Sequence, residues 1–286
     1  MQPSHAQQST PAQSSPLSPE QLTAWEADGY VVVPGLFSPE EVAALQERFR
    51  RLAEGIDRFP DRWEPDWNTS DPLKRYPRVM HPHRFCDLSR QALLKPRVGQ
   101  VLARLFGEAA VACQSMFYFK SPGSAGQALH QDNFYLAVHP GTCIAAWTAL
   151  DPTDADNGGL YVVPGSHRLG VICPDPEKVR DGRSSNLVDP PKGMKAVPVE
   201  MAPGDTLFFG GSLIHGSGRN RTSDRWRRSF IGHYMPISST HVSPAYFPIL
   251  TFDGAEISYE AAARGGPCGE ALGAIANSYG RDAVIH

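Results

Sequence analysis

The segment "ALHQDNFYL", residues 128–136, decides how the fold is read. It places His130 and Asp132 two positions apart in a run of mostly apolar and aromatic residues. On a β-strand, residues i and i+2 point to the same face, so we expect an imidazole and a carboxylate to project side by side from one wall. Two interpretations follow: a buried hydrogen-bonded pair, or two ligands of a metal site.

Short β-rich runs follow one another from Val111 onward. They are separated by Gly, Pro, Asn and Asp, and they include "VACQSMFYFK", "CIAAWTAL", "DTLFFGGSLIH" and "RRSFIGHYM". Helix-start signals precede them at Ser18 and Ser38, each followed by Pro-Glu, and a further helix is expected at about 89–106, closed by Gly107. Helices followed by many short strands predict a mainly β fold with flanking helices, built on an antiparallel barrel or jelly roll.

We expect one folded domain preceded by a tail. Residues 1–18 are rich in Ser, Gln and Pro and are predicted to form a disordered, dispensable tail. The domain, 19–286, is expected to have a helical part at about 19–107, a jelly-roll core at about 108–240 and a C-terminal extension at 241–286. The irregular stretch 57–85 contains His81 and His83, and a loop of that length inside a compact domain is more often functional than idle.

Composition and charge narrow the class of protein. The chain has 286 residues, 41% of them hydrophobic, with a formal net charge of −3 and a pI near 6.4. This balance gives no electrostatic reason to expect nucleic acid or an anionic membrane surface as a partner. We therefore expect a small-molecule substrate and no obligatory protein partner.

The cysteines and the hydropathy pattern favour a cytoplasmic protein. No run approaches the roughly 18 apolar residues that span a bilayer, and the N-terminus lacks the apolar region of a secretory signal. The five cysteines are widely spread and form no Cys-x-x-Cys pair, so we expect reduced thiols instead of a disulfide framework or a structural zinc. They are Cys86, Cys113, Cys143, Cys173 and Cys268.

His215 is the best third ligand for a metal at His130 and Asp132. It ends the strand-like segment "GDTLFFGGSLIH" and is followed by small residues, which let a ligand approach the backbone closely. His139 precedes a proline and His167 lies in the "PGSH" turn, so both are expected to point elsewhere. Two histidines and one carboxylate on one octahedral face are the donor set of the mononuclear non-haem iron(II) oxygenases.

An iron site that activates O2 also needs electrons, and a 2-oxoglutarate co-substrate supplies two. Its distal carboxylate requires a fixed cation, and arginine suits this task because its planar guanidinium gives bidentate hydrogen bonds and stays protonated. The segment after His215 supplies Arg225, Arg227 and Arg228, two of which we expect to be solvated. Ser217, two positions past His215, can add a hydroxyl donor.

The sequence resembles the phytanoyl-CoA dioxygenase family of Fe(II)/2-oxoglutarate oxygenases. The similar segments run in family order from about 111 to 235: "ALHQDNFYL", "CIAAWTALDPTDADNGGLYVVPGSH", "GDTLFFGGSLIHGSGRN" and "RRSFIGHY". The opening "DGYVVVPGLFSPEEV" also looks like the N-terminus of the family. The resemblance implies a double-stranded β-helix, the cupin-like jelly roll, with Fe(II), 2-oxoglutarate and O2 as cofactors.

The resemblance also assigns roles to individual residues. The iron ligands, which are also the catalytic residues, match His130, Asp132 and His215. The co-substrate pocket matches Trp147, Gln114, Met116, Ser217 and an arginine, with core packing as the alternative for Trp147 and Met116. The family arginine usually falls eleven positions after the second histidine, where this chain has Trp226. Aligning the following strand gives Arg227 and implies a one-residue insertion.

The substrate pocket and one turn receive the remaining assignments. Substrate pockets in the family draw on variable loops, and the lining residues expected here are Tyr118, Phe134, His81 and His83. The glycines of Asn157-Gly158-Gly159 are interpreted as a turn requirement and not as part of the chemistry.

The leading hypothesis is a hydroxylase that acts on an unactivated C–H bond of a small metabolite or natural-product intermediate and releases succinate and CO2. Relatives that halogenate replace the metal carboxylate with a small residue, so Asp132 favours hydroxylation, desaturation or ring closure. The alternative is a non-catalytic cupin-type jelly-roll protein that binds a metal or ligand. A nucleic-acid demethylase with the same chemistry conflicts with the acidic balance and the lack of a basic stripe.

Overall fold

A computed structural model describes residues 15–58, 66, 68–70, 72–174, 187–263 and 268 of the chain. The α-helices are α1 (Pro19–Asp28), α2 (Pro39–Ala53), α3 (Pro72–Arg75), α4 (Asp87–Leu93), α5 (Pro96–Phe106) and α6 (Asn133–Leu136). Short 3-10 helices cover Pro82–Arg84, Ser166–Leu169 and Pro244–Tyr246. The strands are β1 (Tyr30–Val33), β2 (Val79–Met80), β3 (Ala110–Tyr118), β4 (Gln127–His130), β5 (Ile144–Ala149), β6 (Leu160–Val162), β7 (Val197–Pro198), β8 (Thr206–Gly210), β9 (His215–Ser217), β10 (Ser229–Pro236), β11 (His241–Val242), β12 (Ile249–Leu250), β13 (Glu256–Ile257) and β14 (Glu260–Ala261). Within the described ranges, no helix is both long and apolar enough to cross a membrane.

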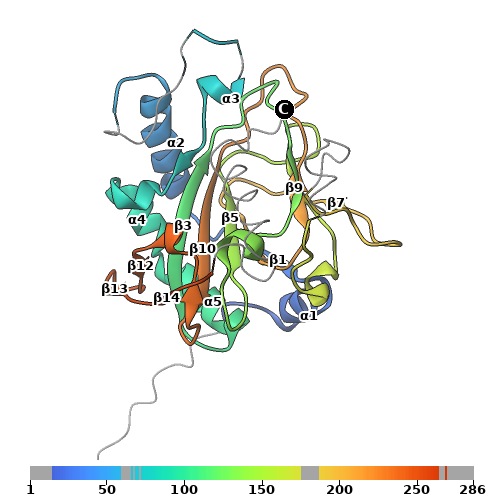
Figure 1. Ribbon diagram of the computed structural model, residues 1–286. Coiled ribbons are helices and arrows are strands. Elements are labelled where there is room, and N and C mark those ends of the chain that lie inside the picture. The colour runs from blue at the N-terminus through green and yellow to red at the C-terminus, as the bar shows by residue number, and fades with distance from the viewer. Residues whose placement is uncertain are drawn as a thin grey trace, which may run out of the picture.

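Two antiparallel sheets form the core of the fold. The larger sheet has the strand order β1-β8-β5-β10-β3-β12-β13, with β2 also paired to β3, and the smaller sheet has the order β4-β9-β6-β7. The short strands β11 and β14 pair separately and in parallel. In Figure 1, β9 and β7 lie on one side of the larger sheet, while α2 and α4 lie on its other side. This arrangement confirms the predicted mainly β fold with flanking helices.

The larger sheet is buried on both faces. On the helix side, Phe117 of β3 stacks on Phe49 of α2, with ring centroids 3.7 Å apart. On the inner side, Met116 and Ile231 pack with residues of β6 in the smaller sheet, and the register pairs Ile231 with both Met116 and Trp147. Since neighbouring residues of a strand point to opposite faces, every second residue of β3, β5 and β10 faces the space between the two sheets.

Proline divides the helix that was expected at 89–106. The structure has α4 ending at Leu93 and α5 beginning at Pro96, with Lys95 between them in a non-helical conformation. The residue before a proline is disfavoured in the α region, and Pro96 occupies the first helical position, which suits it. The predicted end at Gly107 is confirmed, because Gly107 caps α5 with φ +77°.

The structure describes only the last four residues, 15–18, of the segment predicted to be a tail. Leu17 is 2% exposed and packs in the helix-side core, directly before Ser18, which caps α1 in a capping box. Burial of a leucine side chain contributes about 1.5–3 kcal/mol, which offsets a backbone ordering cost of about 1–2 kcal/mol per residue. Residues 1–14 lie outside the described part of the chain. Ser38 begins α2 with the same capping box, as predicted.

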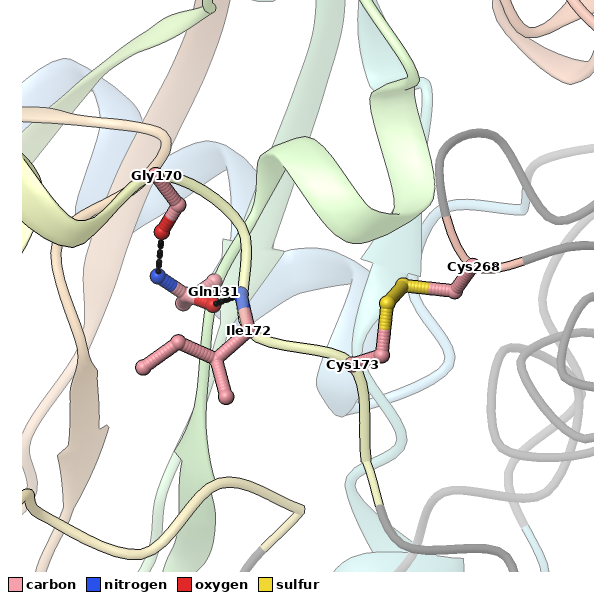
Figure 2. Close-up of a disulfide and its surroundings, with 5 residues drawn as sticks. All are labelled: Gln131, Gly170, Ile172, Cys173 and Cys268. Carbon is pink, nitrogen blue, oxygen red and sulfur yellow. Dashed lines mark hydrogen bonds between the residues drawn. A yellow bond between two sulfur atoms is a disulfide. The ribbon is translucent and has the colours of Figure 1, made fainter.

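Cys173 and Cys268 form a disulfide, with an S–S distance of 2.07 Å (Figure 2). The expectation that all thiols are reduced is therefore wrong for this pair. Their sequence spacing gave no signal, because the two residues are 95 positions apart and only the fold brings their Cα atoms to 5.5 Å. The remaining cysteines are free and buried: Cys86, Cys113 and Cys143.

Candidate metal centre and co-substrate pocket

His130 and Asp132 lie at the junction between a strand and a helix. β4 ends at His130, and Asp132 precedes α6 with the helical dihedral angles φ −66° and ψ −36°. His130 Nε2 lies 3.5 Å from Asp132 Oδ1, and both side chains are buried. The two groups are side by side as predicted, but the strand geometry assumed for both is wrong, because the chain turns into α6 after His130.

His215 completes the group, as predicted. It begins β9, the neighbour of β4 in the smaller sheet, and the register places it directly opposite His130. Its Nε2 lies 3.6 Å from Asp132 Oδ1, and the two imidazole rings have centroids 4.2 Å apart. Ligand atoms of all three residues, hereafter the triad, lie within 4.8 Å of one another. The triad can therefore hold a metal ion.

Backbone carbonyls determine which nitrogen of each histidine is free. His130 Nδ1 donates to the carbonyl oxygen of Ala128 at 2.8 Å, and His215 Nδ1 donates to that of Leu213 at 3.0 Å. A carbonyl only accepts hydrogen bonds, so the proton lies on Nδ1 and the Nε2 lone pair is left for a metal. Burial lowers the pKa of His215 to about 4. This imidazole is therefore neutral at physiological pH, the form that binds metals.

The separations suit one octahedral ion. Ligand atoms about 2.1 Å from an ion and at right angles lie about 3 Å apart. The two histidine nitrogens lie 3.5 and 3.6 Å from Asp132 Oδ1, slightly beyond that separation. Two imidazole nitrogens and one carboxylate oxygen are the donors that open iron(II) sites use, so the residues present fit the predicted iron.

The second oxygen of Asp132 is held by His233 of β10. His233 Nε2 lies 3.0 Å from Asp132 Oδ2, and among the described residues its buried Nδ1 has no hydrogen-bond partner. Burial alone would raise the pKa of Asp132, but the neighbouring His215 and His233 hold it well below the usual range. The carboxylate is thus ionised, with Oδ1 directed at the two ligand histidines. Strand alternation could have indicated this position, since His233 shares the inner face of β10 with Ile231.

Gln131, between two members of the triad, anchors their backbone to a neighbouring loop. Its Nε2 donates to the carbonyl oxygens of Gly170 at 2.7 Å and Ser212 at 2.5 Å, and its Oε1 accepts from the Ile172 amide at 2.7 Å. Figure 2 shows the bonds to Gly170 and Ile172, one residue before the disulfide at Cys173. The residue that separates the two ligands therefore positions them through the backbone.

Arg227 lies inside the fold, as the predicted strand alternation requires. It is 2% exposed. Its guanidinium donates to the Gly158 carbonyl oxygen at 3.1 Å and to Ser229 Oγ at 3.0 Å. Its Cζ lies 5.2 Å from the centroid of the Trp147 ring, a distance within the range of cation–π contacts. Burial lowers the pKa of Arg227 to about 10, which still leaves the guanidinium protonated at neutral pH.

The two neighbouring arginines have carboxylate partners. Arg225 pairs with Asp154, and Arg228 Nη2 pairs with Asp151 Oδ1 at 2.6 Å. They face away from the pocket as predicted, although they form ion pairs where the sequence indicated solvated cations.

Lys120 is a second buried cation beside Arg227, and sequence reasoning missed it. It follows β3, is 7% exposed, and its Nζ donates to Ser217 Oγ at 2.9 Å. Burial and the nearby charge of Arg227 lower the pKa of Lys120 well below its usual range. In the part of the chain that the structure describes, neither cation has a carboxylate within 4 Å. A lysine just after a strand is typical of a solvated strand end, so only the tertiary structure reveals this one.

Gly158 lets the backbone approach both cations. Its φ is +83°, and a Cβ at this position would lie 2.6 Å from Lys120 Cε and 2.8 Å from the Gly218 carbonyl oxygen. The side chain of Asn157 accepts from the Asp154 amide at 3.0 Å, which is consistent with the predicted turn. The glycine therefore does more than permit the turn, because it makes room for the pocket.

The other residues predicted for the co-substrate pocket share the inner face of the larger sheet. Gln114 pairs with His233, and Met116 pairs with Ile231, which in turn lies opposite Trp147. Met116, Trp147 and Tyr118 belong to the cluster packed between the two sheets. Core packing was the alternative for Trp147 and Met116. The two alternatives do not exclude each other here, because the expected pocket wall is part of this packed cluster.

His83 lies away from this pocket. Its Nδ1 lies 2.7 Å from Ser115 Oγ. Ser115 stands between two inward-facing residues of β3 and therefore points to the helix side. Burial lowers the pKa of His83 to about 4. These contacts tie His83 to β3, and its role as a substrate-lining residue stays a prediction.

Of the aromatic pair after Asp132, Tyr135 lies beside a metal ligand. The Tyr135 ring centroid lies 6.1 Å from that of His130. Phe134 was expected as a lining residue because substrate pockets in the family draw on variable loops, and it directly precedes Tyr135 in α6. The ring centroids of His81 and Tyr246 are 6.1 Å apart.

The fold and the triad together define a class of protein, the mononuclear non-haem iron oxygenases built on a jelly roll. The family follows from comparison with known proteins. The model of the phytanoyl-CoA dioxygenase (PhyH) family matches residues 25–229, and the chain belongs to this family. It is a 2-oxoglutarate-dependent non-haem iron oxygenase with iron and 2-oxoglutarate as cofactors, which sets aside the non-catalytic alternative.

Individual relatives agree with the family assignment. Phytanoyl-CoA dioxygenase 1 of Oryza sativa subsp. japonica is 28% identical over 239 residues, which cover 71% of this chain and 84% of the relative. The epimerase SnoN in complex with Fe3+, alpha ketoglutarate and nogalamycin RO gives a TM-score of 0.64 at 25% identity, covering 85% of this chain and 93% of that one. EctD from S. alaskensis with 2-oxoglutarate and 5-hydroxyectoine gives a TM-score of 0.62 at 25% identity, covering 81% and 80%. These likenesses confirm the double-stranded β-helix.

Removing one ligand of the triad is expected to abolish metal binding without unfolding the protein. We expect His215→Ala and Asp132→Ala to weaken Fe(II) binding by more than the roughly 10–100-fold that loss of an outer hydrogen-bond partner costs. Anaerobic equilibrium dialysis with iron determination measures the affinity, and circular dichroism checks the fold.

His139→Ala is the matched control, because His139 is exposed and should leave iron binding unchanged. A His215→Ala variant that still held one tightly bound iron per chain would show that the third ligand is wrong. His81, His83 or His233 would then be tested in its place.

Proposed function

We propose that the protein hydroxylates an unactivated C–H bond of a small organic molecule, a metabolite or a natural-product intermediate, with release of succinate and CO2. One observation carries the proposal: among the described residues, two buried cations without carboxylate partners lie close to the β9 face that carries a member of the triad. Ser217, the partner of Lys120, follows His215 by two positions on β9 and therefore shares its face. This arrangement suits an iron ion next to a dicarboxylate.

When bound, iron and 2-oxoglutarate supply the oxidising chemistry, in which O2 converts the oxo acid to succinate and CO2 and delivers one oxygen atom to the substrate. The residues of the chain bind and orient these groups and exclude water. The triad holds the ion on one face and leaves its other positions open. Arg227 and Ser217 bind the distal carboxylate, while the walls that exclude water are Trp147, Gln114 and Met116.

The carboxylate of Asp132 supports oxygen transfer over halogenation, because it occupies the position that a halide would need. Other outcomes of the same chemistry use the same ligands, and the relative SnoN is described as an epimerase. Hydroxylation is proposed here because it needs no group on the chain beyond those described.

We assign the substrate side of the iron to an aromatic wall formed by Tyr135, Tyr246 and His81, with Tyr118 at the border of the co-substrate pocket. Tyr246 packs on the same apolar cluster as Tyr135, and burial and then the charge of Asp132 raise the pKa of Tyr246. Rings of this kind favour an organic substrate with apolar surface. The bound molecules named for SnoN and EctD, nogalamycin RO and 5-hydroxyectoine, are small molecules as well.

The cytoplasmic location stays a prediction. The disulfide between Cys173 and Cys268 is the observation against it, because disulfides are rare in the reducing cytosol. The absence of nucleic-acid and obligatory protein partners, and the division into a single domain, also stay predictions from charge and composition.

A metabolite panel tests the proposed reaction. Fe(II)-loaded protein with 2-oxoglutarate and O2 should release succinate in the presence of one class of small molecule, and the product should gain the mass of one oxygen atom. Asp132→Ala should release none. Substrate-dependent succinate with a product that lacks the added oxygen would contradict hydroxylation and favour desaturation, ring closure or epimerisation.

Arg227→Ala is expected to raise the apparent constant for 2-oxoglutarate about ten- to a hundredfold, because a buried charge-assisted hydrogen bond contributes roughly 1.5–3 kcal/mol. Initial rates of succinate release at a fixed substrate concentration give this constant. Arg225→Ala and Arg228→Ala lose only their own ion pairs and serve as controls with little expected change. A large effect of Arg228→Ala with a small effect of Arg227→Ala would mean that the assumed strand face is inverted.

A further inference from the structure

The loop 170–173 connects the disulfide to the backbone of the metal ligands. Gln131, the residue between two members of the triad, is 1% exposed and accepts from the Ile172 amide at 2.7 Å. Cys173 follows Ile172 directly and is bonded to Cys268 (Figure 2). A continuous path of covalent and hydrogen bonds therefore runs from the disulfide to the triad.

The side chain of Ile172 adds apolar packing to this path. It belongs to the small apolar cluster that includes Leu129 and Ile214, and these two residues directly precede the ligand histidines His130 and His215. Protein interiors are close-packed and transmit strain between neighbouring side chains. The loop is therefore placed so that its position affects the chain next to all three ligands.

The disulfide is accessible to a reductant. Cys173 is exposed and Cys268 is half-buried, whereas the three free cysteines are buried. Attack of a thiolate on a disulfide requires access to a sulfur atom, which this bond provides. In a cytosol, where the chain is predicted to reside, disulfides are usually transient and catalytic or redox-sensing.

We propose that the Cys173–Cys268 pair is a redox-sensitive site that sets the affinity of the triad for iron. In the oxidised form, the disulfide fixes the loop against Gln131 and the apolar cluster. A dithiol reduces the bond by thiol–disulfide exchange: it gives up two electrons and two protons, becomes a disulfide itself and leaves two cysteine thiols. The loop then loses its covalent anchor, and the ligands beside it are held less firmly.

The iron affinities of the two redox forms test this proposal. The protein is oxidised with glutathione disulfide or reduced with a phosphine, the reagent is removed by gel filtration, and mass spectrometry of an alkylated sample counts the thiols. Anaerobic equilibrium dialysis then gives the Fe(II) dissociation constant. We expect reduction to raise this constant about tenfold, the lower end of the roughly 10–100-fold effect of losing an outer partner of a metal ligand, because the hydrogen bonds of Gln131 can re-form.

Serine variants separate the disulfide from other effects of the reductant. Cys173→Ser and Cys268→Ser should each bind iron as the reduced wild type does and should not respond to the phosphine. Cys86→Ser is the matched control, because it keeps the disulfide and should retain the full response. Gln131→Ala removes the polar link, so its oxidised and reduced forms should differ less in iron affinity than those of the wild type. Circular dichroism checks the fold of each variant.

Equal iron affinity of the oxidised and reduced wild type would overturn the proposal, as would five alkylated thiols after oxidation, since the chain has five cysteines. Absence of iron binding in both forms would overturn the metal centre together with this inference. A redox-dependent iron affinity supports the inference whether or not the proposed hydroxylation is found, because the measurement involves no substrate.

Discussion

The pairing of β4 with β9 is the constraint on which the site depends. Its register places His130 opposite His215, with ring centroids 4.2 Å apart, and β4 ends there, so that Asp132 turns back toward both rings. A slip of β4 by one residue would move His130 to the face of the sheet opposite His215 and separate the ligands. The carbonyls of Ala128 and Leu213 then select the nitrogen that each ring presents. Metal binding therefore depends on the register of these two strands as well as on the identity of the three ligand residues.

Charge compensation explains the surroundings of the triad. An ion buried without a partner costs several kcal/mol even after relaxation, and most charged groups near the site have a counter-charge or a histidine beside them. Asp132 lies against His215 and His233. Arg227 and Lys120 differ, because a backbone carbonyl and two serine hydroxyls are their hydrogen-bond acceptors among the described residues. The protein therefore keeps uncompensated positive charge where the co-substrate is proposed to bring two carboxylates, one for the metal and one for this pocket.

The sequence was informative wherever function depends on local spacing. The triad followed from the two-residue spacing and the small residues after His215, and the inward direction of Arg227 followed from alternation along one strand. Tyr135 was missed because β4 ends at His130 and α6 begins at Asn133, where the sequence analysis assumed a strand. Lys120 was missed because its burial arises from a contact with Ser217 of β9, which is distant in sequence and which no local pattern records. The disulfide was missed for the same reason.

The visible absorption spectrum of the protein without O2 tests whether the triad and the co-substrate pocket form one centre. Fe(II) alone should leave the protein colourless. Addition of 2-oxoglutarate should then produce a weak charge-transfer band that saturates at one iron and one 2-oxoglutarate per chain, because the 2-oxo acid chelates the iron held by the triad. If calorimetry shows both components bound while no band develops, the oxo acid does not reach the iron, and the assignment of this pocket to the co-substrate is wrong.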